Sequence, residues 1–229
     1  MQINFSKIPA VIYGEESKNV YIYVHGFLGK KEDAEEFSKI ANKKGFQVLS
    51  FDLPGHGERR KNSEQAPEMP SFSKVVADLE TIYEEANSDW KNISIYAVSL
   101  GAYFSLVTFQ GLDIEKALLV SPVVNMKNLI ERTMKNSGIT PEILKARKNI
   151  PELNLSWDYY KFTLENEITD WNCKTEILYP ERDNLTPRNE AEEFVKKFNC
   201  GLTVLPNGEH YIHTEEDLKI LRAWEEKNA

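Results

Sequence analysis

The serine at position 99 stands where a strand pattern changes into a helix pattern. The segment before it, from Asn92 to Val98, is mainly apolar and alternating, and the small residues of Leu100-Gly101-Ala102 follow it. This order predicts a strand, a sharp turn and a helix, with the Ser99 hydroxyl exposed at the tip of a sheet. The positive end of the helix would then lie beside an oxyanion formed on a substrate carbonyl. These residue types indicate a nucleophile for acyl transfer, although a small-residue turn containing serine can also join a strand and a helix without any chemistry.

An acid and a base further along the chain could complete the machinery that such a serine needs. Asp183 and His210 each follow an apolar run that predicts a strand, so the chain order is serine, aspartate, histidine. In acyl transfer the histidine takes the proton of the serine hydroxyl, and the carboxylate holds the imidazole in the required tautomer. We therefore predict that Ser99, Asp183 and His210 form a catalytic triad. Glu181 is the alternative acid and His213 the alternative base.

A loop after an earlier strand could bind the oxyanion. The apolar run from Val20 to Val24 leads into His25-Gly-Phe-Leu-Gly29, where glycines let the backbone curl over a site. The backbone amides of this loop could supply one hydrogen bond to the oxyanion, beside the bond from the amide that follows Ser99.

These motifs together resemble the α/β-hydrolase family. The elbow Ala97-Val-Ser99-Leu-Gly101 departs from the usual Gly-x-Ser-x-Gly by one methyl group at Ala97, and we expect its geometry to survive. The segment Asp52-Leu-Pro-Gly-His56-Gly-Glu-Arg is similar to the loop after the fourth strand of that family. The resemblance covers essentially the whole chain. It implies a single α/β-hydrolase domain over residues 1–229, with a mostly parallel, doubly wound sheet and helices on both faces.

The resemblance also implies roles for residues around the serine. It assigns the oxyanion amides to Leu100 and Phe27, with Leu28 as the alternative to Phe27, and we place the Leu28 side chain at the substrate pocket. No cofactor is implied. We expect His25 to bond the loop backbone rather than to take part in the chemistry. The neighbouring carboxylate and imidazole of segment 52–56 are likewise expected to be structural, although they border the pocket.

Strand and helix patterns alternate along the chain, which favours a doubly wound sheet. The predicted sheet begins with an edge hairpin over residues 2–13, and a polar surface loop is predicted over 58–70. The other expected strands are 20–25, 46–52, 92–98, 116–122, one that starts at about 175 and ends before Asp183, and about 202–206. The expected covering helices are 33–44, 71–86, one that begins at about 100, 187–198 and 214–227.

The segment from 123 to 171 is too long for an ordinary connection between two strands. Apolar residues recur in it at helical spacing, Thr140-Pro141 is typical of a helix start, and Ser156 is placed to cap a helix that begins at Trp157. Such a helical insertion is similar to the lid of the α/β-hydrolase family. If some of its side chains face the cleft, Met134 and Trp157 would line an apolar pocket. The alternative is that its apolar stripes only anchor it to the sheet.

Composition excludes several other functions. The 28 basic and 36 acidic residues give a formal net charge of −8 without a long basic cluster, so nucleic acid and anionic membranes are poor partners. No apolar run is long enough for a signal peptide or a membrane span, and we expect a soluble, cytoplasmic protein. Cys173 and Cys200 lack a metal-ligand spacing, so no metal is predicted. Two free thiols are expected, with a disulfide as the alternative, because the resemblance makes the strands that follow the two cysteines neighbours in the sheet. The oligomeric state cannot be predicted.

The predicted activity is hydrolysis of a small-molecule acyl ester, with a small or medium acyl group, by a carboxylesterase. A serine nucleophile disfavours the dehalogenase and epoxide-opening branches of the fold, which use aspartate. Thioesterase, aminopeptidase and carbon–carbon hydrolase activities use the same triad and stay open. A binding protein on a hydrolase fold is a further alternative, because fold alone does not determine function.

Overall fold

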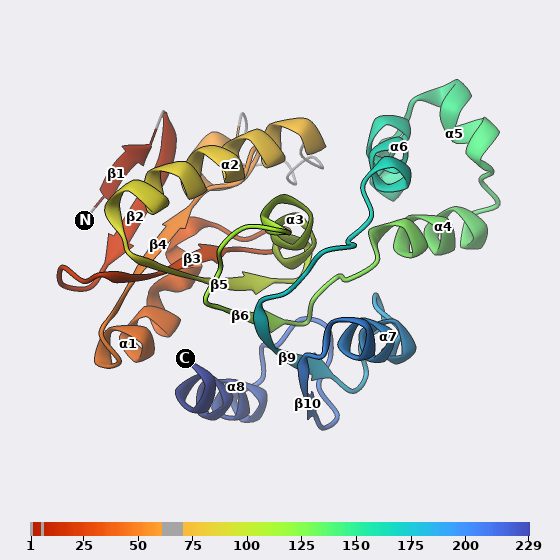
Figure 1. Cartoon of the computed structure of the whole chain (residues 1–229). Helices are drawn as coiled ribbons and strands as arrows, with labels where there is room; N and C mark the ends of the chain where they lie inside the picture. Colours follow the sequence, from red (N-terminus) through yellow and green to blue (C-terminus); the bar gives the residue numbers. More distant parts are fainter. Residues whose placement is uncertain (1, 6, 61–70) are drawn as a thin grey trace.

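A mostly parallel sheet forms the centre of the structure, a computed structural model that describes residues 2–5, 7–60 and 71–229. Its strands are β1 (Gln2–Phe5), β2 (Ile8–Tyr13), β3 (Asn19–Val24), β4 (Phe46–Phe51), β5 (Asn92–Val98), β6 (Lys116–Val120), β9 (Lys174–Pro180) and β10 (Gly201–Leu205). Their order across the sheet is β1-β2-β4-β3-β5-β6-β9-β10 (Figure 1). β2 is antiparallel to both of its neighbours, and every other pair is parallel. The predicted edge hairpin and mostly parallel sheet are therefore confirmed.

Helices cover both faces of this sheet. α1 (Glu35–Lys43) and α8 (Glu215–Asn228) pack on one face, and α2 (Phe72–Asp89), α3 (Leu100–Phe109) and α7 (Arg188–Phe198) pack on the other (Figure 1). Along β5, Ile95 belongs to the apolar cluster under α2 and α3, whereas Tyr96 belongs to the cluster under α1 and α8. Successive strand residues point to opposite faces, so a strand covered on both faces is apolar throughout.

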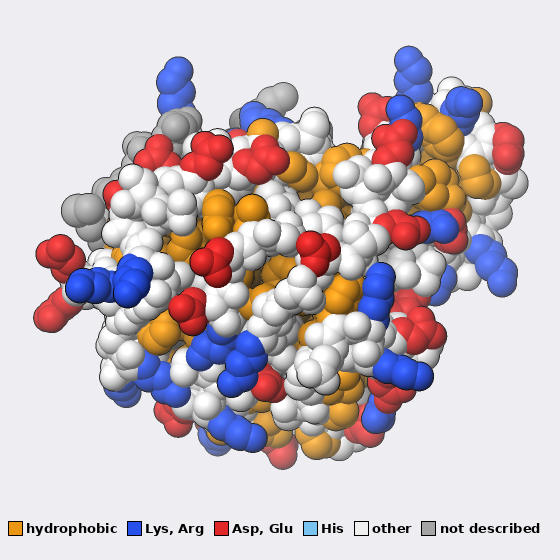
Figure 2. Space-filling model, viewed as in Figure 1, with side chains coloured by type: hydrophobic (Ala, Val, Ile, Leu, Met, Phe, Trp, Pro, Cys, Tyr) orange, Lys and Arg blue, Asp and Glu red, His pale blue; other side chains and the backbone are white. Residues whose placement is uncertain are grey.

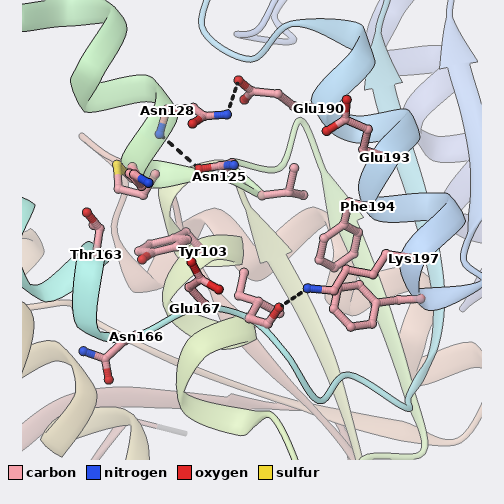
Figure 3. Close-up of a pocket in the computed structure, with 15 residues that line it drawn as sticks. Tyr103, Asn125, Asn128, Thr163, Asn166, Glu167, Glu190, Glu193, Phe194 and Lys197 are labelled. Carbon is pink, nitrogen blue, oxygen red and sulfur yellow. Dashed lines mark hydrogen bonds between the residues drawn. The ribbon is translucent and has the colours of Figure 1, made fainter.

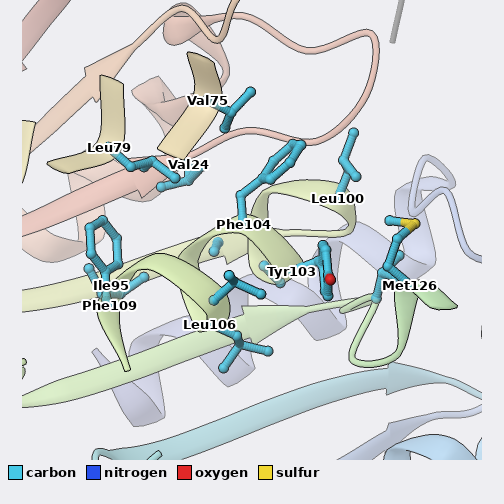
Figure 4. Close-up of a cluster of buried hydrophobic side chains, with 14 of the residues drawn as sticks. Val24, Val75, Leu79, Ile95, Leu100, Tyr103, Phe104, Leu106, Phe109 and Met126 are labelled. Atoms are coloured by element: carbon cyan, nitrogen blue, oxygen red, sulfur yellow. The ribbon is translucent and has the colours of Figure 1, made fainter. Parts of the chain in front are cut away.

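α3 is the most deeply buried helix near the predicted nucleophile. Nine of its ten residues are buried, and its side chains meet those of β3, β5 and α2 (Figure 4). Gly101 allows this packing, because a Cβ atom there would lie 2.4 Å from the carbonyl oxygens of both Val24 and His25. Real Cβ atoms do not approach backbone so closely, so the helix that follows Ser99 requires glycine at this position.

Local helix signals agree closely with the structure. Thr140 caps α5 (Pro141–Arg147) by accepting from the Ile143 amide at 3.4 Å, and Ser156 caps α6 (Trp157–Glu165) through the Tyr159 amide at 3.5 Å. Two details differ from expectation. α2 continues to Asp89 rather than ending near residue 86, and residue 187 precedes α7 instead of forming its first turn. Residues 61–70 of the predicted surface loop lie outside the described residues.

The insertion between β6 and β9 is helical, as its patterns predict. It contains α4 (Met126–Asn136), α5 and α6, together with a small antiparallel pair, β7 (Asn149–Ile150) and β8 (Leu155–Ser156), that the sequence did not reveal. Met126, Ile130 and Met134 of α4 are buried in the main apolar cluster, and the Phe162 ring of α6 stacks on Phe72 of α2 with centroids 3.4 Å apart. Much of the apolar surface of this insertion therefore anchors it to the rest of the molecule.

The outer surface carries charges of both signs. Acidic and basic side chains are interspersed on the face shown in Figure 2, and apolar side chains come to the surface over the insertion. Within the part of the chain that the structure describes, no helix has the length and apolar character needed to cross a membrane.

Candidate active site

Ser99 lies at a strained turn between β5 and α3. Its backbone has φ 50° and ψ −114°, a region that residues other than glycine rarely adopt and that is often found at functional sites. Ala97, two residues earlier, is fully buried, so its methyl group is accommodated in the core. Gly26 of the opposite loop approaches closely, since a Cβ atom there would lie 3.4 Å from the Ser99 Cβ. The turn presents the serine beside the loop that was predicted to bind an oxyanion.

The structure brings the three predicted triad side chains together in one hydrogen-bonded series. Ser99 Oγ lies 2.7 Å from His210 Nε2, and His210 Nδ1 lies 2.7 Å from Asp183 Oδ2. A carboxylate can only accept hydrogen bonds, so the proton of the neutral imidazole belongs on Nδ1 and Nε2 is free to accept from the serine hydroxyl. This arrangement can remove a proton from Ser99 as its oxygen attacks a carbonyl.

Asp183 is held in place by its own loop. The side chain is fully buried, Oδ1 accepts from the amides of Leu185 at 2.8 Å and Thr186 at 2.9 Å, and Oδ2 accepts from the Thr186 hydroxyl at 2.8 Å. Burial favours the neutral acid, but the bond and charge of His210 and these two amides outweigh it and hold the pKa of the Asp183 carboxyl below its usual range. Asp183 is therefore an anion whose orientation depends on the 183–186 segment.

The alternative acid and base have other partners. Glu181 is exposed, and its Oε2 accepts from the Asn207 amide at 2.8 Å, which fastens the loop after β10. His213 is exposed as well, and its Nδ1 pairs with the Tyr211 carbonyl at 2.8 Å. Geometry thus favours Asp183 and His210 for the triad.

His25 fixes the start of the predicted oxyanion loop. The Leu53 amide donates to His25 Nε2 at 3.1 Å, so Nδ1 carries the ring proton and donates to the Gly26 carbonyl at 2.8 Å. Burial lowers the pKa of His25 to about 4, which keeps the ring neutral in this role. The prediction that His25 bonds the loop backbone is confirmed.

A buried ion pair fixes the other end of the same loop. Lys31 is 2% exposed, its Nζ lies 3.3 Å from Asp52 Oδ2 and 2.6 Å from Glu58 Oε1, and its amide donates to Asp52 Oδ1 at 2.8 Å. Asp52 thus has the structural role that was expected of it. Sequence reasoning missed Lys31, because nothing in the chain near residue 31 signals a buried lysine.

Between these two anchors the loop makes a tight turn beside Ser99. The Gly29 amide donates to the Gly26 carbonyl at 3.1 Å, and Leu28 has φ 70°. Phe27 lies in this turn, with its ring edge-on to His56 at 5.6 Å, and the Leu28 side chain is 66% exposed. Leu100 is the first residue of α3, where an amide has no acceptor within its helix. The two amides predicted to bind an oxyanion therefore belong to two segments near Ser99, the turn that follows Gly26 and the start of α3.

The other two predicted pocket residues lie within the insertion. Met134 is 3% exposed and belongs to the apolar cluster that anchors α4. Trp157 is half-buried, with its ring edge-on to Tyr160 at 6.0 Å and the Lys145 ammonium 5.5 Å from its centre. An apolar stripe shows that a helix has a buried face, but it does not show whether that face meets a cleft or the core.

A separate cavity of about 310 Å³ lies between α3, α4, α6 and α7 (Figure 3). Tyr103, Asn128, Thr163, Glu190 and Lys197 are among the residues that line it, and the triad side chains are not. Over residues 2–5, 7–60 and 71–229, no cluster of three or more His, Cys, Asp or Glu side chains could hold a metal ion. The two cysteines are unpaired, and burial raises the pKa of the Cys173 thiol to about 12 and that of Cys200 to about 11.

Comparison with known sequences gives one family match and one curated relative. The sequence profile described as "Serine aminopeptidase, S33" matches residues 15–156. A Mycoplasma genitalium protein named "Putative esterase/lipase 2" is 23% identical over 132 residues, which cover 54% of this chain and 47% of that protein. The matched region thus spans about half the length of the curated relative.

Solved structures share the fold over nearly the whole chain. Est1E from Butyrivibrio proteoclasticus, solved with ferulic acid bound, has a TM-score of 0.72 at 18% identity and covers 99% of this chain and 96% of its own. The Paleococcus ferrophilus monoacylglycerol lipase has a TM-score of 0.69 at 18% identity, with 96% and 97% covered. Mouse alpha/beta hydrolase domain-containing protein 10 has a TM-score of 0.71 at 14% identity, with 98% and 95% covered. At these identities the likeness establishes the fold.

Proposed function

Because the chain belongs to the serine aminopeptidase (S33) family of α/β hydrolases, we propose that it is a serine carboxylesterase in which Ser99 is the nucleophile. The observation that carries the proposal is the continuous series from Ser99 Oγ through His210 to Asp183, with 2.7 Å at each contact. This arrangement requires a strained backbone at Ser99 and a buried carboxylate at Asp183. Both are energetically unfavourable, and packing alone requires neither of them.

The first half of the reaction forms an acyl-enzyme. Ser99 Oγ attacks the ester carbonyl carbon while His210 Nε2 takes the hydroxyl proton, and the carbonyl oxygen becomes an oxyanion. The amides of Phe27 and Leu100 bind that oxyanion, and each such donor typically contributes about 3 to 4 kcal/mol to the transition state. The carbon–oxygen bond to the alcohol then breaks, and the imidazolium returns its proton to the leaving alkoxide.

The second half releases the acid. A water molecule attacks the acyl carbon while His210 takes its proton, and the second tetrahedral intermediate expels Ser99, which recovers its proton from the imidazolium. Asp183 stays ionised throughout and stabilises the cation on His210. No step requires a group from outside the chain other than the ester and water.

We further propose that the helical insertion over residues 123–171 acts as a lid that selects a small or medium acyl group. One support is the position of this insertion between β6 and β9, because β6 is the neighbour of β5, the strand that leads to Ser99. A second support is Trp157, which is half-buried in the insertion. Ester, thioester, aminoacyl amide and carbon–carbon bonds can all be cleaved by the same triad. The ester is preferred because the similar proteins include one named a putative esterase/lipase, by sequence, and a monoacylglycerol lipase, by fold.

A substrate panel tests this choice. Acetyl, butyryl and octanoyl p-nitrophenyl esters, the matching thioesters and aminoacyl p-nitroanilides should be compared at equal protein concentration, with Ser99→Ala as the blank. The ester series should give the highest kcat/KM, with acetyl or butyryl preferred over octanoyl. A higher kcat/KM for the aminoacyl anilides would instead assign an aminopeptidase, and no turnover of any substrate above the blank would favour a binding protein.

A further inference from the structure

The side chain of Arg132 joins the insertion to the segment that carries the predicted acid. Arg132 lies on α4, and its Nη2 donates to the carbonyl of Leu185 at 2.7 Å. Its Nη1 forms an ion pair with the carboxylate of Glu190 on α7. α4 and α7 are neighbours in Figure 1, although about sixty residues separate them in the chain.

Glu190 aims the guanidinium at the acid segment. It is 7% exposed, and its Oε1 also accepts from Asn128 Nδ2 at 3.2 Å, one helical turn before Arg132 (Figure 3). Two successive turns of α4 therefore dock on one buried carboxylate. A planar guanidinium can bond this carboxylate and the Leu185 carbonyl at the same time, in a fixed geometry that a lysine ammonium cannot reproduce.

Leu185 connects this contact to the triad. The Leu185 carbonyl that Arg132 holds forms one peptide unit with the Thr186 amide, which donates to Asp183 Oδ1 at 2.9 Å, and the amide of Leu185 itself donates to the same oxygen at 2.8 Å. The other carboxylate oxygen, Asp183 Oδ2, lies 2.7 Å from His210 Nδ1. A continuous set of hydrogen bonds thus runs from α4 through Leu185 and Asp183 to the imidazole.

We propose that Arg132 is a positioning residue for the catalytic acid and couples the seating of α4 to the orientation of Asp183. The inference rests on the proposed serine hydrolase function, and it adds that a residue of the insertion helps to orient the catalytic acid. In the structure, Arg132 of α4 holds the 183–186 segment through the Leu185 carbonyl, and Asp183 faces His210. When the contacts of Arg132 are removed, the segment loses this support and Asp183 holds the imidazole of His210 less firmly in one orientation. Misplacement by about 1 Å can cost about 100-fold in rate, so losing the contact has a kinetic effect without any contact to substrate.

The test compares Arg132→Leu and Arg132→Lys with native protein on p-nitrophenyl butyrate. Arg188→Gln is the matched control. Arg188 lies on α7, the helix that carries Glu190, but it forms an exposed ion pair with Glu192 at 2.8 Å. We expect kcat to fall about 10- to 100-fold in Arg132→Leu and less in Arg132→Lys, with KM within about threefold of native. The downfield proton resonance of the Asp183–His210 hydrogen bond should broaden or vanish in step with kcat. The control should match native protein in both respects.

Three results would overturn the proposal. The first is native kcat in both Arg132 variants, even with a lowered Tm, because the ion pair would then be purely structural. The second is a lowered kcat with an unchanged downfield resonance, because the effect would not pass through Asp183. The third is an equal loss in Arg188→Gln. If Arg132→Leu does not fold, Arg132→Lys decides alone, since it keeps the charge opposite Glu190. Ser99-dependent turnover by native protein in the same assay separates failure of this proposal from failure of the proposed function.

Discussion

The hydroxyl of Tyr96 donates a 2.5 Å hydrogen bond to the carboxyl group of Glu225 beneath the central sheet. Glu225 lies on α8 and is 4% exposed, and Tyr96 is on β5, three residues before Ser99. Burial raises the pKa of Glu225 to about 7, although the tyrosine bond partly opposes this. The carboxyl group is therefore protonated in the folded protein below neutral pH.

The elevated pKa of Glu225 predicts a pH-dependent stability. An ordinary glutamate ionises near pH 4.5, so between pH 4.5 and 7 the unfolded chain binds fewer protons and the contribution of Glu225 to stability is lost as the pH rises. The loss amounts to about 3 kcal/mol. Relative to native protein, Glu225→Gln should gain about this much free energy of unfolding across that window, because glutamine keeps an acceptor for Tyr96 without ionising.

Denaturant unfolding of both proteins at several pH values measures this difference. Comparison with native protein is needed because His25 also makes the free energy of unfolding depend on pH. Its pKa is lowered to about 4, so its contribution to stability rises between pH 4 and 6.5, opposite in sign to that of Glu225. Glu226→Gln, at the exposed neighbouring position, is the control and should parallel the native curve. If the free energies of unfolding of Glu225→Gln and native protein differed by the same amount at all pH values, the prediction would be refuted.

Asp183→Asn should lower kcat by about 10⁴, because the amide favours the wrong tautomer of His210. Glu181→Gln should retain most activity, since Glu181 is exposed and bonds the Asn207 amide. Steady-state kinetics with p-nitrophenyl butyrate, with circular dichroism as the check on folding, measures both. Retained activity in Asp183→Asn together with a large loss in Glu181→Gln would move the role to Glu181.

His210→Ala should abolish turnover, while His213→Ala should stay within a fewfold of native protein. The reason is that His210 Nε2 is 2.7 Å from Ser99 Oγ, whereas the His213 ring stacks on Tyr211 with centroids 5.2 Å apart at the surface. The same kinetic assay checks the pair. Activity in His210→Ala, with His213→Ala inactive and folded, would reverse the assignment.

The sequence predicted best the features that depend on near neighbours in the chain. The Thr140 and Ser156 caps, the elbow at Ser99 and the alternation of strands and helices are local signals, and each is present in the structure. The triad partners could be chosen because parallel strands bring their carboxyl ends to one edge of the sheet, which places loops that are distant in sequence close together.

The features that sequence reasoning missed join distant residues through buried carboxyl groups. Arg132 and Glu190 lie 58 positions apart, and Tyr96 and Glu225 lie 129 apart. A charged residue in a helix pattern normally indicates a solvent-facing side, and only the tertiary packing makes it a buried partner. The apolar stripe that includes Met134 was identified correctly as a buried face of a helix, but its direction depends on how α4 docks.

Trp157→Ala should change the acyl chain-length preference of the enzyme, whereas Met134→Ala should mainly lower its Tm. Trp157 is half-buried in the insertion, but Met134 is 3% exposed in the core cluster, where a shortened side chain costs about 2 to 5 kcal/mol. Specificity constants for acetyl, butyryl and octanoyl esters, with thermal melts, separate the two effects. An unchanged preference in Trp157→Ala would reject its place at the acyl pocket.

Covalent labelling of Ser99 tests the central claim most directly. Native protein treated with a fluorophosphonate should gain one label, located by mass spectrometry on the peptide that contains Ser99, and ester turnover should fall in proportion. Folded Ser99→Ala should take up no label and should lose about 10⁴- to 10⁶-fold in kcat. A label at another residue, or near-native turnover by folded Ser99→Ala, would contradict the account.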